Sequence, residues 1–393
     1  MWPEHAQKFE KIAKDFEKDT GIHVELRVVP WDALTQTLMT GFASGDVPDV
    51  SVCWSNQMGI FHSIDEVMDL TPYLEENNGE WKEAFFPEGL ELCSVNNKYY
   101  AIPFRGSFSI FAYNKTLFAK YGWHEPDSLS DFENEMEKMK EAGLIPVIAA
   151  GSPSGFRIAT IADNFTDQKL LADGIIKRED YLLGHYIQVA DAYSYGGAKT
   201  REWMNKEYIG KYGLAMQREE ATSLFTLQKA VITLINNNEL PTLESIAQEA
   251  GFELGFFAFP VPAGSEPLLS HCNFDSFMIS SKTKHPNEAV EFLKYLSRTD
   301  IQQEFGNLSK SIMGNRHCNY EDPFQDQFSD IVVNSSSYVI NYDYNSGNLE
   351  TRINTALTDF ISDPSMTPEE YGNKVEKYMH VTLNEAESDE SQY

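Results

Sequence analysis

The side chains that could perform covalent chemistry do not fall in any spacing that catalysis requires. The run Gly151-Ser152-Pro153-Ser154-Gly155 is close to a nucleophile elbow, but that motif needs serine at its centre, where Pro153 stands. His124-Glu125 continues into Pro126 and lacks the second histidine of the zinc-binding helix motif, and no glycine-rich phosphate loop is present. We therefore expect no catalytic residue, no metal site and no cofactor.

The four cysteines and the sixty acidic residues do not indicate a catalytic or metal site any more strongly. No two cysteines have the C-x-x-C spacing of a zinc knuckle or a redox motif, and a chain of this length does not depend on disulfides. Glycoside hydrolysis needs two carboxyl groups roughly 5–10 Å apart, and the sequence alone does not exclude such a pair. However, no acidic residue lies in a recognisable catalytic position, so a glycan-active enzyme is retained only as an alternative.

Length and charge limit the classes of function further. The chain has 393 residues, for which two domains are the ordinary expectation. Its formal net charge of -29 repels phosphate backbones, so we expect no nucleic-acid partner. No apolar stretch approaches the roughly 20 residues that a membrane-spanning helix needs.

The elements that must position any functional side chain alternate between helix and strand. Phe9, Ile12, Ala13 and Phe16 recur at helical spacing within residues 4–19, and Gly21 is placed to end that helix. Residues 22–28 alternate between apolar and polar side chains, as a half-buried strand does. The other expected elements are a helix over 33–43, strands over 48–54, 146–150, 230–235, 256–261 and 277–279, a helix from Thr242 to Gly251, and a helix over 286–296.

Two capping boxes are predicted, in which a serine or threonine begins a helix and a glutamate three residues later bonds back to it. One is Ser130-Asp131-Phe132-Glu133, and the other is Thr367-Pro368-Glu369-Glu370. The alternation of helices and strands is typical of an α/β protein with largely parallel strands. No internal repeat or flexible linker is seen, which favours two lobes joined by several crossing strands.

Several segments, in their order along the chain, resemble the extracellular solute-binding proteins of carbohydrate importers, the maltose-binding-like family. The most specific block is Tyr99-Tyr100-Ala101-Ile102-Pro103 together with the run from Tyr113 to Phe118. Other family-like segments are Trp31–Val50, Asp69–Leu74, Phe259–Gly264, Phe277–Ser281 and Glu288–Leu296. Two segments depart from the family pattern: only Met1-Trp2-Pro3 precedes the first helix, where the family has a strand, and Gln228–Ile232 lacks a Gly-Lys-Ala-Ala-Met-like signature.

The resemblance implies a type II periplasmic-binding-protein-like α/β fold, with a ligand cleft between two lobes joined by hinge strands. We expect residues 1–112 with 263–315 to form the N-terminal lobe, and residues 113–262 with 316–393 to form the C-terminal lobe. The implied function is capture of a sugar or oligosaccharide by cleft closure, with delivery to a membrane permease of an ABC importer.

A sugar site needs planar aromatic rings for the C–H face and polar side chains for the hydroxyl rim. Such groups are expected next to strand ends, where α/β sheets bind ligands. Each has a structural alternative, such as lobe packing for Trp54, a hinge salt bridge for Arg105 and a turn for the asparagine run. The candidates at strand ends and in the adjoining loops are Trp54, Asn56, Arg105, Ser107, Asn236, Asn238, Glu239, Asn273 and Asp275.

The resemblance adds candidates at matching places in the family. Phe156 lies where the family often stacks an aromatic ring on the sugar, with Arg157 beside it, and helix packing is the alternative. Trp2, Glu4 and His5 lie where the family's first strand meets its helix. Tyr344 belongs to an aromatic cluster that could close the cleft.

The expected partners are a carbohydrate ligand and permease subunits, with the protein itself a monomer. The first residues show no export signal, which leaves a cytoplasmic protein or one whose signal has been removed. The resemblance favours the second, and hence an extracytoplasmic protein, either a cell-surface lipoprotein or periplasmic. A binding protein for another solute, such as a polyamine, is the remaining alternative.

Overall fold

The computed structural model describes residues 5–151, 157–174, 189–210, 213–265, 267–269, 272–337 and 349–390. The chain divides into two compact units, each made of two segments. Unit 1 consists of Met1–Ser107 and Asn273–Pro323, and unit 2 of Phe108–Cys272 and Phe324–Tyr393. The expected crossings lie at 112/113, 262/263 and 315/316, and these two units change at 107/108, 272/273 and 323/324. The first of these changes falls inside a continuous strand, where the amino-acid pattern carries no boundary signal.

Unit 1 is built on three neighbouring strands, in the order β1, β9 and the first part of β4. β1 pairs antiparallel with β9, with Val50 opposite Ile279 and Trp54 opposite Asp275. The helices and strands of this unit are α1 (Ala6–Thr20), α2 (Trp31–Ser44), β1 (Val50–Trp54), η2 (Ser55–Gln57), α3 (Met58–Ser63), α4 (Thr71–Leu74), η3 (Glu76–Gly79), α5 (Glu80–Glu83), α6 (Pro87–Leu92), β2 (Ser94–Val95), β3 (Lys98–Tyr99), β4 (Ala101–Asn114), β9 (Cys272–Ile279), α14 (Pro286–Leu296) and α15 (Thr299–Ser309).

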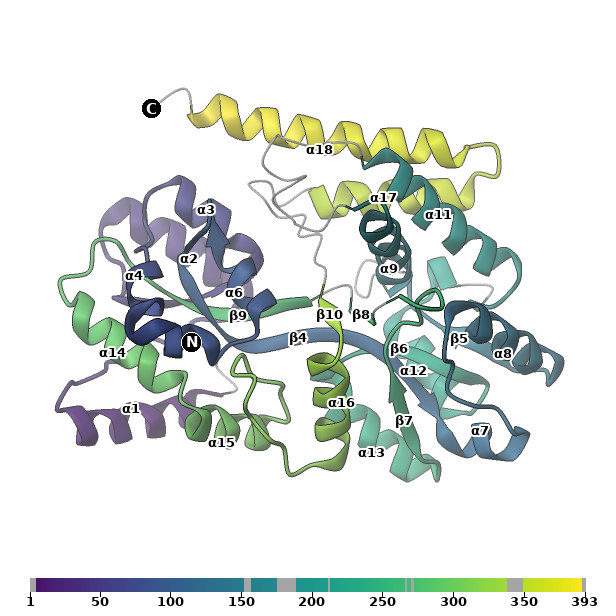
Figure 1. Ribbon diagram of the computed structural model, residues 1–393, viewed down its shortest axis with the longest axis horizontal. Helices are drawn as coiled ribbons and strands as arrows, with labels where there is room; N and C mark the ends of the chain where they lie inside the picture. Colours follow the sequence, from purple (N-terminus) through teal and green to yellow (C-terminus); the bar gives the residue numbers. More distant parts are fainter. Residues whose placement is uncertain are drawn as a thin grey trace. The chain divides into compact units, whose positions relative to one another are not determined.

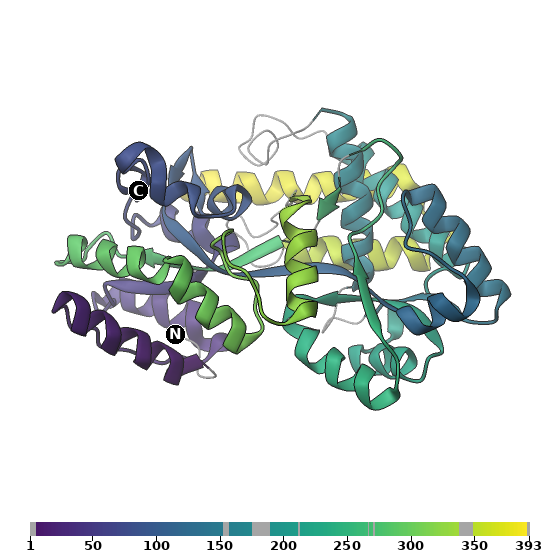
Figure 2. The ribbon, with the colours of Figure 1, turned by 60° about the horizontal axis from the view of Figure 1, so that its bottom comes forward.

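An aromatic core fixes the helices of unit 1 on these strands. The ring of Phe104, on β4, lies 5.1 Å from the rings of both Phe277 and Phe305 and 5.6 Å from that of Phe9. Such ring pairs stabilise the fold by more than the burial of their apolar surface alone would. α1 packs beside α14, and α14 beside α15 (Figure 2). The apolar stripe predicted for α1 is confirmed, since Phe9 and Phe16 are buried, and Gly21 ends the helix at a positive φ of 77°.

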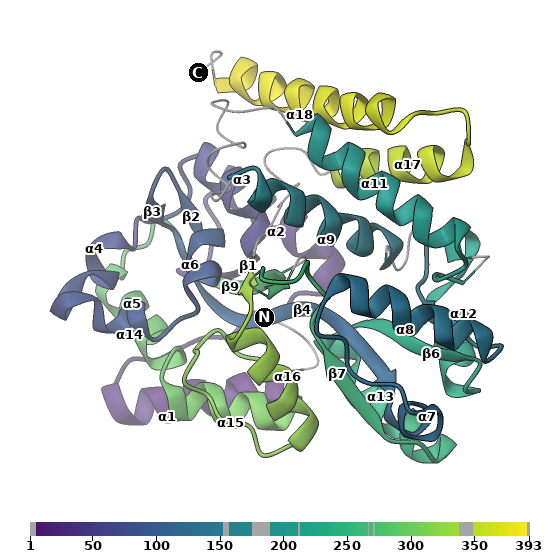
Figure 3. The ribbon, with the colours of Figure 1, turned by 45° about the vertical axis from the view of Figure 1, so that its right-hand side comes forward.

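Unit 2 contains the second part of β4, which pairs with both β6 and β7 (Figure 3). β5 runs parallel to β6, and every residue of β6 is buried. The elements of this unit are α7 (Lys115–Tyr121), α8 (Leu129–Glu141), β5 (Ile145–Ile148), α9 (Arg157–Ala172), α11 (Ala190–Asn205), η4 (Gly213–Ala215), α12 (Arg218–Thr226), β6 (Ala230–Asn236), η5 (Asn237–Glu239), α13 (Leu240–Ala250), β7 (Leu254–Phe257), β8 (Leu268–Leu269), α16 (Pro323–Val333), β10 (Ser336–Ser337), α17 (Leu349–Ser362) and α18 (Pro368–Glu390).

Helices cover the strands of unit 2 and form a second core among themselves. α11 packs against α9, α17 and α18, which lie close together at the top of Figure 1. Phe360 and Tyr371 stack there at 5.0 Å. None of the described helices is both long enough and apolar enough to cross a bilayer.

Four expectations for the local structure are corrected. Residues 22–28 form no strand, and the predicted alternation of exposure holds only as far as Arg27, because Val28 is exposed as well. α8 is capped by Ser128, whose hydroxyl accepts from the Asp131 amide, so the capping serine is two residues earlier than predicted. The helix that ends before Gly251 begins at Leu240, so Thr242 lies inside it. The strand expected over 256–261 is β7, Leu254–Phe257, because its pairing with β4 fixes the register.

Candidate ligand-binding site

A partly exposed face of unit 1 brings four predicted residues onto two neighbouring strands. β4 is buried at every position except Arg105 and Ser107. On β9, Asn273 and Asp275 are likewise half-buried, while Phe274 and Ser276 between and beyond them are buried. Because side chains on a strand alternate between faces, each of these pairs points to one side of its strand. The two pairs interrupt strands that are otherwise covered by the core.

Arg105 and Asp275 form an ion pair on this face. The guanidinium donates through Nε and Nη2 to Asp275 Oδ2, at 2.7 and 2.6 Å, and the two side chains are only 12% and 13% exposed. Nη1 of Arg105 lies 3.0 Å from Nε2 of His5, just before α1. The pKa of the Lys8 ammonium, one turn further along the helix, is lowered mainly by burial and to a smaller extent by the positive charge of Arg105. Asp275 therefore occupies the Nε and Nη2 side of the guanidinium and fixes its position on this face.

The end of β1 adds an aromatic residue to the same face, and Ser55 directly after it contacts Asn273. Trp54 ends β1 directly opposite Asp275 and is half-buried. Ser55, which follows it, donates to Asn273 Oδ1 at 2.6 Å and accepts from the Phe274 amide at 3.1 Å. The side-chain oxygen of Asn273 is therefore occupied. Its side-chain nitrogen, Nδ2, has no hydrogen-bond partner among the described residues. This nitrogen remains as a donor for a ligand.

Unit 2 has a second group of predicted residues, centred on Glu239. Arg157, which begins α9 and is 8% exposed, forms an ion pair with Glu239 and donates to Ser109 Oγ at 3.4 Å. Arg218, at the start of α12, lies 3.6 Å from the other oxygen of Glu239. Burial lowers the pKa of the Arg157 guanidinium; the Glu239 carboxylate opposes this effect and the charge of Arg218 adds to it. The group thus holds two guanidinium groups around one carboxylate.

The three consecutive asparagines have separate roles. Asn236 and Glu239 form a capping box: Asn236 Oδ1 accepts from the Asn238 amide at 3.1 Å, and Glu239 accepts from the Asn236 amide at 2.7 Å. Asn237 is buried and accepts from the Phe108 amide at 2.8 Å, which fixes β4 beside β6. Only the side chain of Asn238 is exposed. The predicted turn is therefore present, and Asn238 is the amide best placed to meet a ligand.

A cavity of about 400 Å³ opens beside these residues within unit 2. Its lining combines small apolar residues, hydroxyls and charged groups, a mixture that suits a small polar ligand. The residues of this lining that can form hydrogen bonds are Arg157, Arg218, Glu219, Thr222, Thr233, Asn238, Glu239 and Thr242.

The structure unites most of the predicted residues into these two groups, one on each unit. His5, Trp54, Arg105, Ser107, Asn273 and Asp275 belong to the first group, and Arg157, Asn236, Asn238 and Glu239 to the second. Trp2, Glu4, Phe156, Tyr344 and the side chain of Asn56 lie outside the described part of the chain.

Two residues of these groups, Ser55 and Arg218, were not predicted. Ser55 had a usable signal, since it is a small polar residue directly after a strand and beside two predicted residues. Arg218 had no such signal, because it lies 21 positions from its partner and begins a helix with no motif.

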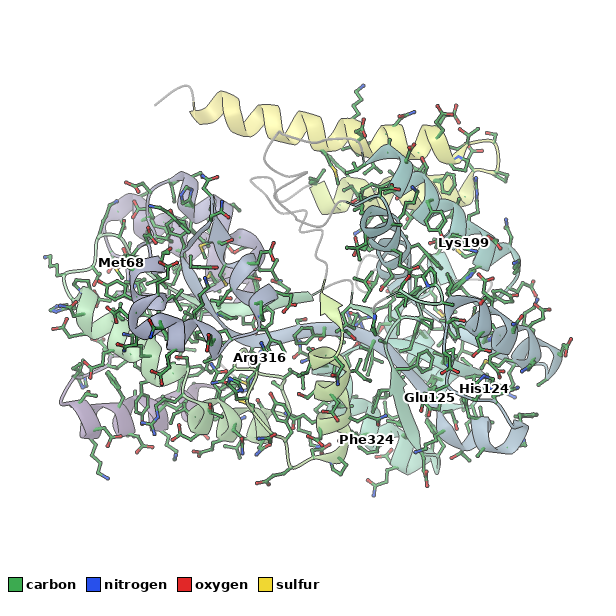
Figure 4. All side chains as sticks on the ribbon, viewed as in Figure 1. Met68, His124, Glu125, Lys199, Arg316 and Phe324 are labelled. Atoms are coloured by element: carbon green, nitrogen blue, oxygen red, sulfur yellow. The ribbon has the colours of Figure 1, made fainter. Side chains whose placement is uncertain are left out.

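One group of metal-capable side chains occurs among the described residues, and it shares no residue with either group. This group lies at the start of α8 and consists of His124, which is labelled in Figure 4, Asp131 and Glu135. The imidazole ring lies between the two carboxylates, with Nε2 at 3.0 Å from Asp131 and Nδ1 at 3.2 Å from Glu135. Lys138 also pairs with Glu135. These contacts pair the three side chains with one another and with Lys138, while Oε2 of Glu135 is buried without a hydrogen-bond partner among the described residues.

Comparison with known proteins gives consistent matches. The family model described as bacterial extracellular solute-binding protein matches residues 2–303. A relative named multiple sugar-binding protein, from Streptococcus mutans, is 27% identical over 77% of this chain and 70% of its own length. A putative binding protein of Brucella abortus is 32% identical over 76% of this chain and 70% of its own.

The fold also matches solved structures. The ligand-free structure of RafE from Streptococcus pneumoniae superposes with a TM-score of 0.78 at 19% identity, covering 97% of this chain and 96% of RafE. At that identity the likeness concerns the fold alone. It confirms the predicted α/β fold class of two-lobe binding proteins.

Proposed function

The chain belongs to the bacterial extracellular solute-binding protein family, and from this premise we propose that it binds a sugar or oligosaccharide outside the cytoplasm for an ABC importer. It acts as a monomeric receptor, anchored at the cell surface or free in the periplasm, and passes its ligand to a membrane permease. The name of the Streptococcus mutans relative, a multiple sugar-binding protein, supports a carbohydrate as the ligand.

The observation that carries the proposal is the exposure pattern of β4 and β9. Ligand-binding proteins place a few polar groups in fixed positions on an otherwise packed scaffold. Arg105 and Ser107, with Asn273 and Asp275, are such groups, and Trp54 stands at the end of the adjacent strand. Together they present a fixed guanidinium group, a hydroxyl, an amide and an aromatic ring, which are the kinds of group that a sugar's rim and C–H face require.

The same contacts favour binding over glycan cleavage. A glycosidase needs one protonated carboxyl group and one free carboxylate facing the scissile bond. Here Asp275 is held by Arg105, and Glu239 is held by Arg157 with Arg218 nearby. Both carboxylates are thus engaged by arginine side chains, which favours a site that releases its ligand unchanged. A polyamine is also disfavoured, since a cationic ligand would meet three arginines in these two groups.

Calorimetric titration against a panel of mono- and oligosaccharides, with a polyamine and an amino-acid mixture as comparators, tests this function. We expect saturable binding of at least one sugar, which Trp54→Ala weakens, and mass spectrometry should recover that sugar intact. Binding confined to the non-sugar comparators would refute the ligand class. Shortened sugar products would refute the receptor function.

A further inference from the structure

Unit 2 carries a histidine and two carboxylates that converge and belong to neither group of the candidate ligand-binding site. His124, labelled in Figure 4, lies between α7 and α8, and Asp131 and Glu135 are four positions apart on α8. Because a helix completes one turn in 3.6 residues, the two carboxylates lie on one face of α8. One ligand atom from each of the three side chains lies within 4.8 Å of the others. We call these three residues the α8 cluster.

The members of the α8 cluster differ in how freely they can move. The side chain of His124 is 54% exposed and that of Asp131 is 29% exposed, whereas that of Glu135 is only 1% exposed. A tetrahedral ion with bonds of about 2.1 Å holds its ligand atoms about 3.4 Å apart. The imidazole already lies 3.0 Å from Asp131 and 3.2 Å from Glu135, through different ring nitrogens. A turn of the exposed ring is therefore the main change that would direct one nitrogen and both carboxylates at a single ion.

The buried member of the α8 cluster has an unsatisfied oxygen. Oε1 of Glu135 faces the imidazole and also pairs with Lys138, so the carboxylate is directed at the cluster. Oε2 of the same carboxylate is buried and has no hydrogen-bond partner among the described residues. A buried carboxylate oxygen without a donor destabilises the folded state, and a bound ion is one way to satisfy it. The α8 cluster therefore has both the ligand types of a metal site and a buried oxygen that a metal ion would satisfy.

The charges and ligand types of the α8 cluster define the class of ion. Two carboxylates face one ammonium group, that of Lys138, whose side chain is exposed and can turn toward solvent. The positive end of the α8 dipole opposes a cation, but it is equivalent to only about half an elementary charge. Two carboxylates alone would also suit Ca²⁺ or Mg²⁺, which prefer oxygen ligands. The imidazole nitrogen favours zinc and other transition-metal ions instead.

We propose that the α8 cluster binds a divalent transition-metal ion of the zinc class, with His124, Asp131 and Glu135 as its protein ligands. The ion joins the segment after α7 to α8 and acts as a structural ion of unit 2. No metal site is expected from the sequence, because six residues separate the histidine from the first carboxylate and three separate the two carboxylates, a spacing that matches none of the motifs considered. The site shares no residue with the candidate sugar site, so it is independent of the ligand that the receptor carries.

Calorimetric titration of the chelator-treated full chain with Zn²⁺ alone tests the proposal. We expect one zinc ion to bind per chain, with Mg²⁺ and Ca²⁺ bound at least about tenfold more weakly. Zinc should also slow amide hydrogen exchange over residues 123–135, because the ion would hold the segment before α8 against the first turns of that helix.

Matched variants place the ion in the α8 cluster. His124→Gln removes the ring nitrogen and should weaken zinc binding at least about tenfold, since even the loss of a residue behind a metal ligand costs about ten- to a hundredfold. The control is His23→Gln, which should leave binding within about twofold. His23 is also exposed and lies 3.0 Å from Glu17, but it belongs to no metal-capable group among the described residues.

Lys138→Gln gives a test of opposite sign. It removes the ammonium group that competes for Glu135, so zinc binding should become about threefold tighter or more. Circular dichroism checks that all three variants are folded. Absence of zinc binding, equal effects of the two histidine variants, or binding of Ca²⁺ as tight as that of Zn²⁺ would overturn the proposal. Weaker zinc binding in Lys138→Gln would refute the placement of the ion at Glu135.

Discussion

Replacement of Arg105 separates its part in the fold from its part in ligand recognition. Arg105→Ala leaves Asp275 without its guanidinium partner at 13% exposure. Breaking a fully buried pair costs about 3–5 kcal/mol, and the small remaining exposure reduces this to about 2–3 kcal/mol. For a unit of this size, we expect the melting temperature to fall by roughly 4–12 °C.

Arg105→Lys is the sharper variant, because it keeps the charge and removes the fork. An ammonium group can replace one of the contacts to Asp275 and His5 but not all three. We expect a loss of only about 1 kcal/mol in unfolding free energy. Sugar affinity should fall about tenfold or more, since a hydrogen bond from a charged donor contributes about 1.5–3 kcal/mol.

Thermal unfolding of the ligand-free variants and calorimetric titration with the bound sugar provide the two readouts. Wild-type affinity in Arg105→Lys would show that the guanidinium does not touch the ligand. An unchanged melting temperature in Arg105→Ala would show that the pair with Asp275 does not stabilise unit 1. Either result would refute the corresponding part of the reasoning.

Three further predictions concern unit stability and thiol chemistry. Gly255→Ala would place a Cβ 2.3 Å from the Tyr113 ring, so we expect a loss of about 3 kcal/mol or more in urea unfolding, and a stable variant would contradict this packing. Thr367→Ala removes the confirmed capping box with Glu370 and should cost about 1 kcal/mol, with faster hydrogen exchange in the first turn of α18; unchanged exchange would argue against the cap. Burial raises the pKa of the Cys318 thiol to about 12, so at pH 8 its reaction with a disulfide reagent, mapped by mass spectrometry, should be about a thousandfold slower than in denaturant, and a similar rate in both states would refute its burial.

Local patterns predicted much of the scaffold. Helical periodicity predicted α1. Proline in the first turn predicted the start of α14, which runs from Pro286 to Leu296. Thr367 and Glu370 form the predicted box because its two hydrogen bonds join residues only three positions apart. These elements depend on short-range physics, which a single sequence contains.

The errors arise where long-range pairing decides the structure. Residues 22–28 have the pattern of a strand, but a strand needs a neighbour to supply hydrogen bonds. Pairing of β7 with β4, across more than a hundred residues, sets a register that the apolar run 256–261 does not contain.

In the candidate site, too, local patterns predicted single residues, whereas long-range contacts decide how these residues interact. The sequence predicted Arg105 just beyond a strand and Asp275 just before one, and both placements are wrong: Arg105 lies inside β4 and Asp275 inside β9. Their ion pair joins residues 170 positions apart. Nothing in the local sequence decided whether Asn237 faces solvent or supports the Phe108 amide. The sequence could therefore nominate residue types at strand ends, whereas their mutual contacts depend on the assembled sheet.

Amide hydrogen exchange with and without saturating sugar tests the central claim most directly. We predict slower exchange on sugar binding at Trp54–Gln57, Arg105–Ser107 and Asn273–Asp275 in unit 1, and at 236–239 in unit 2. No change at these segments, with protection appearing elsewhere in the chain, would contradict the assignment of the site.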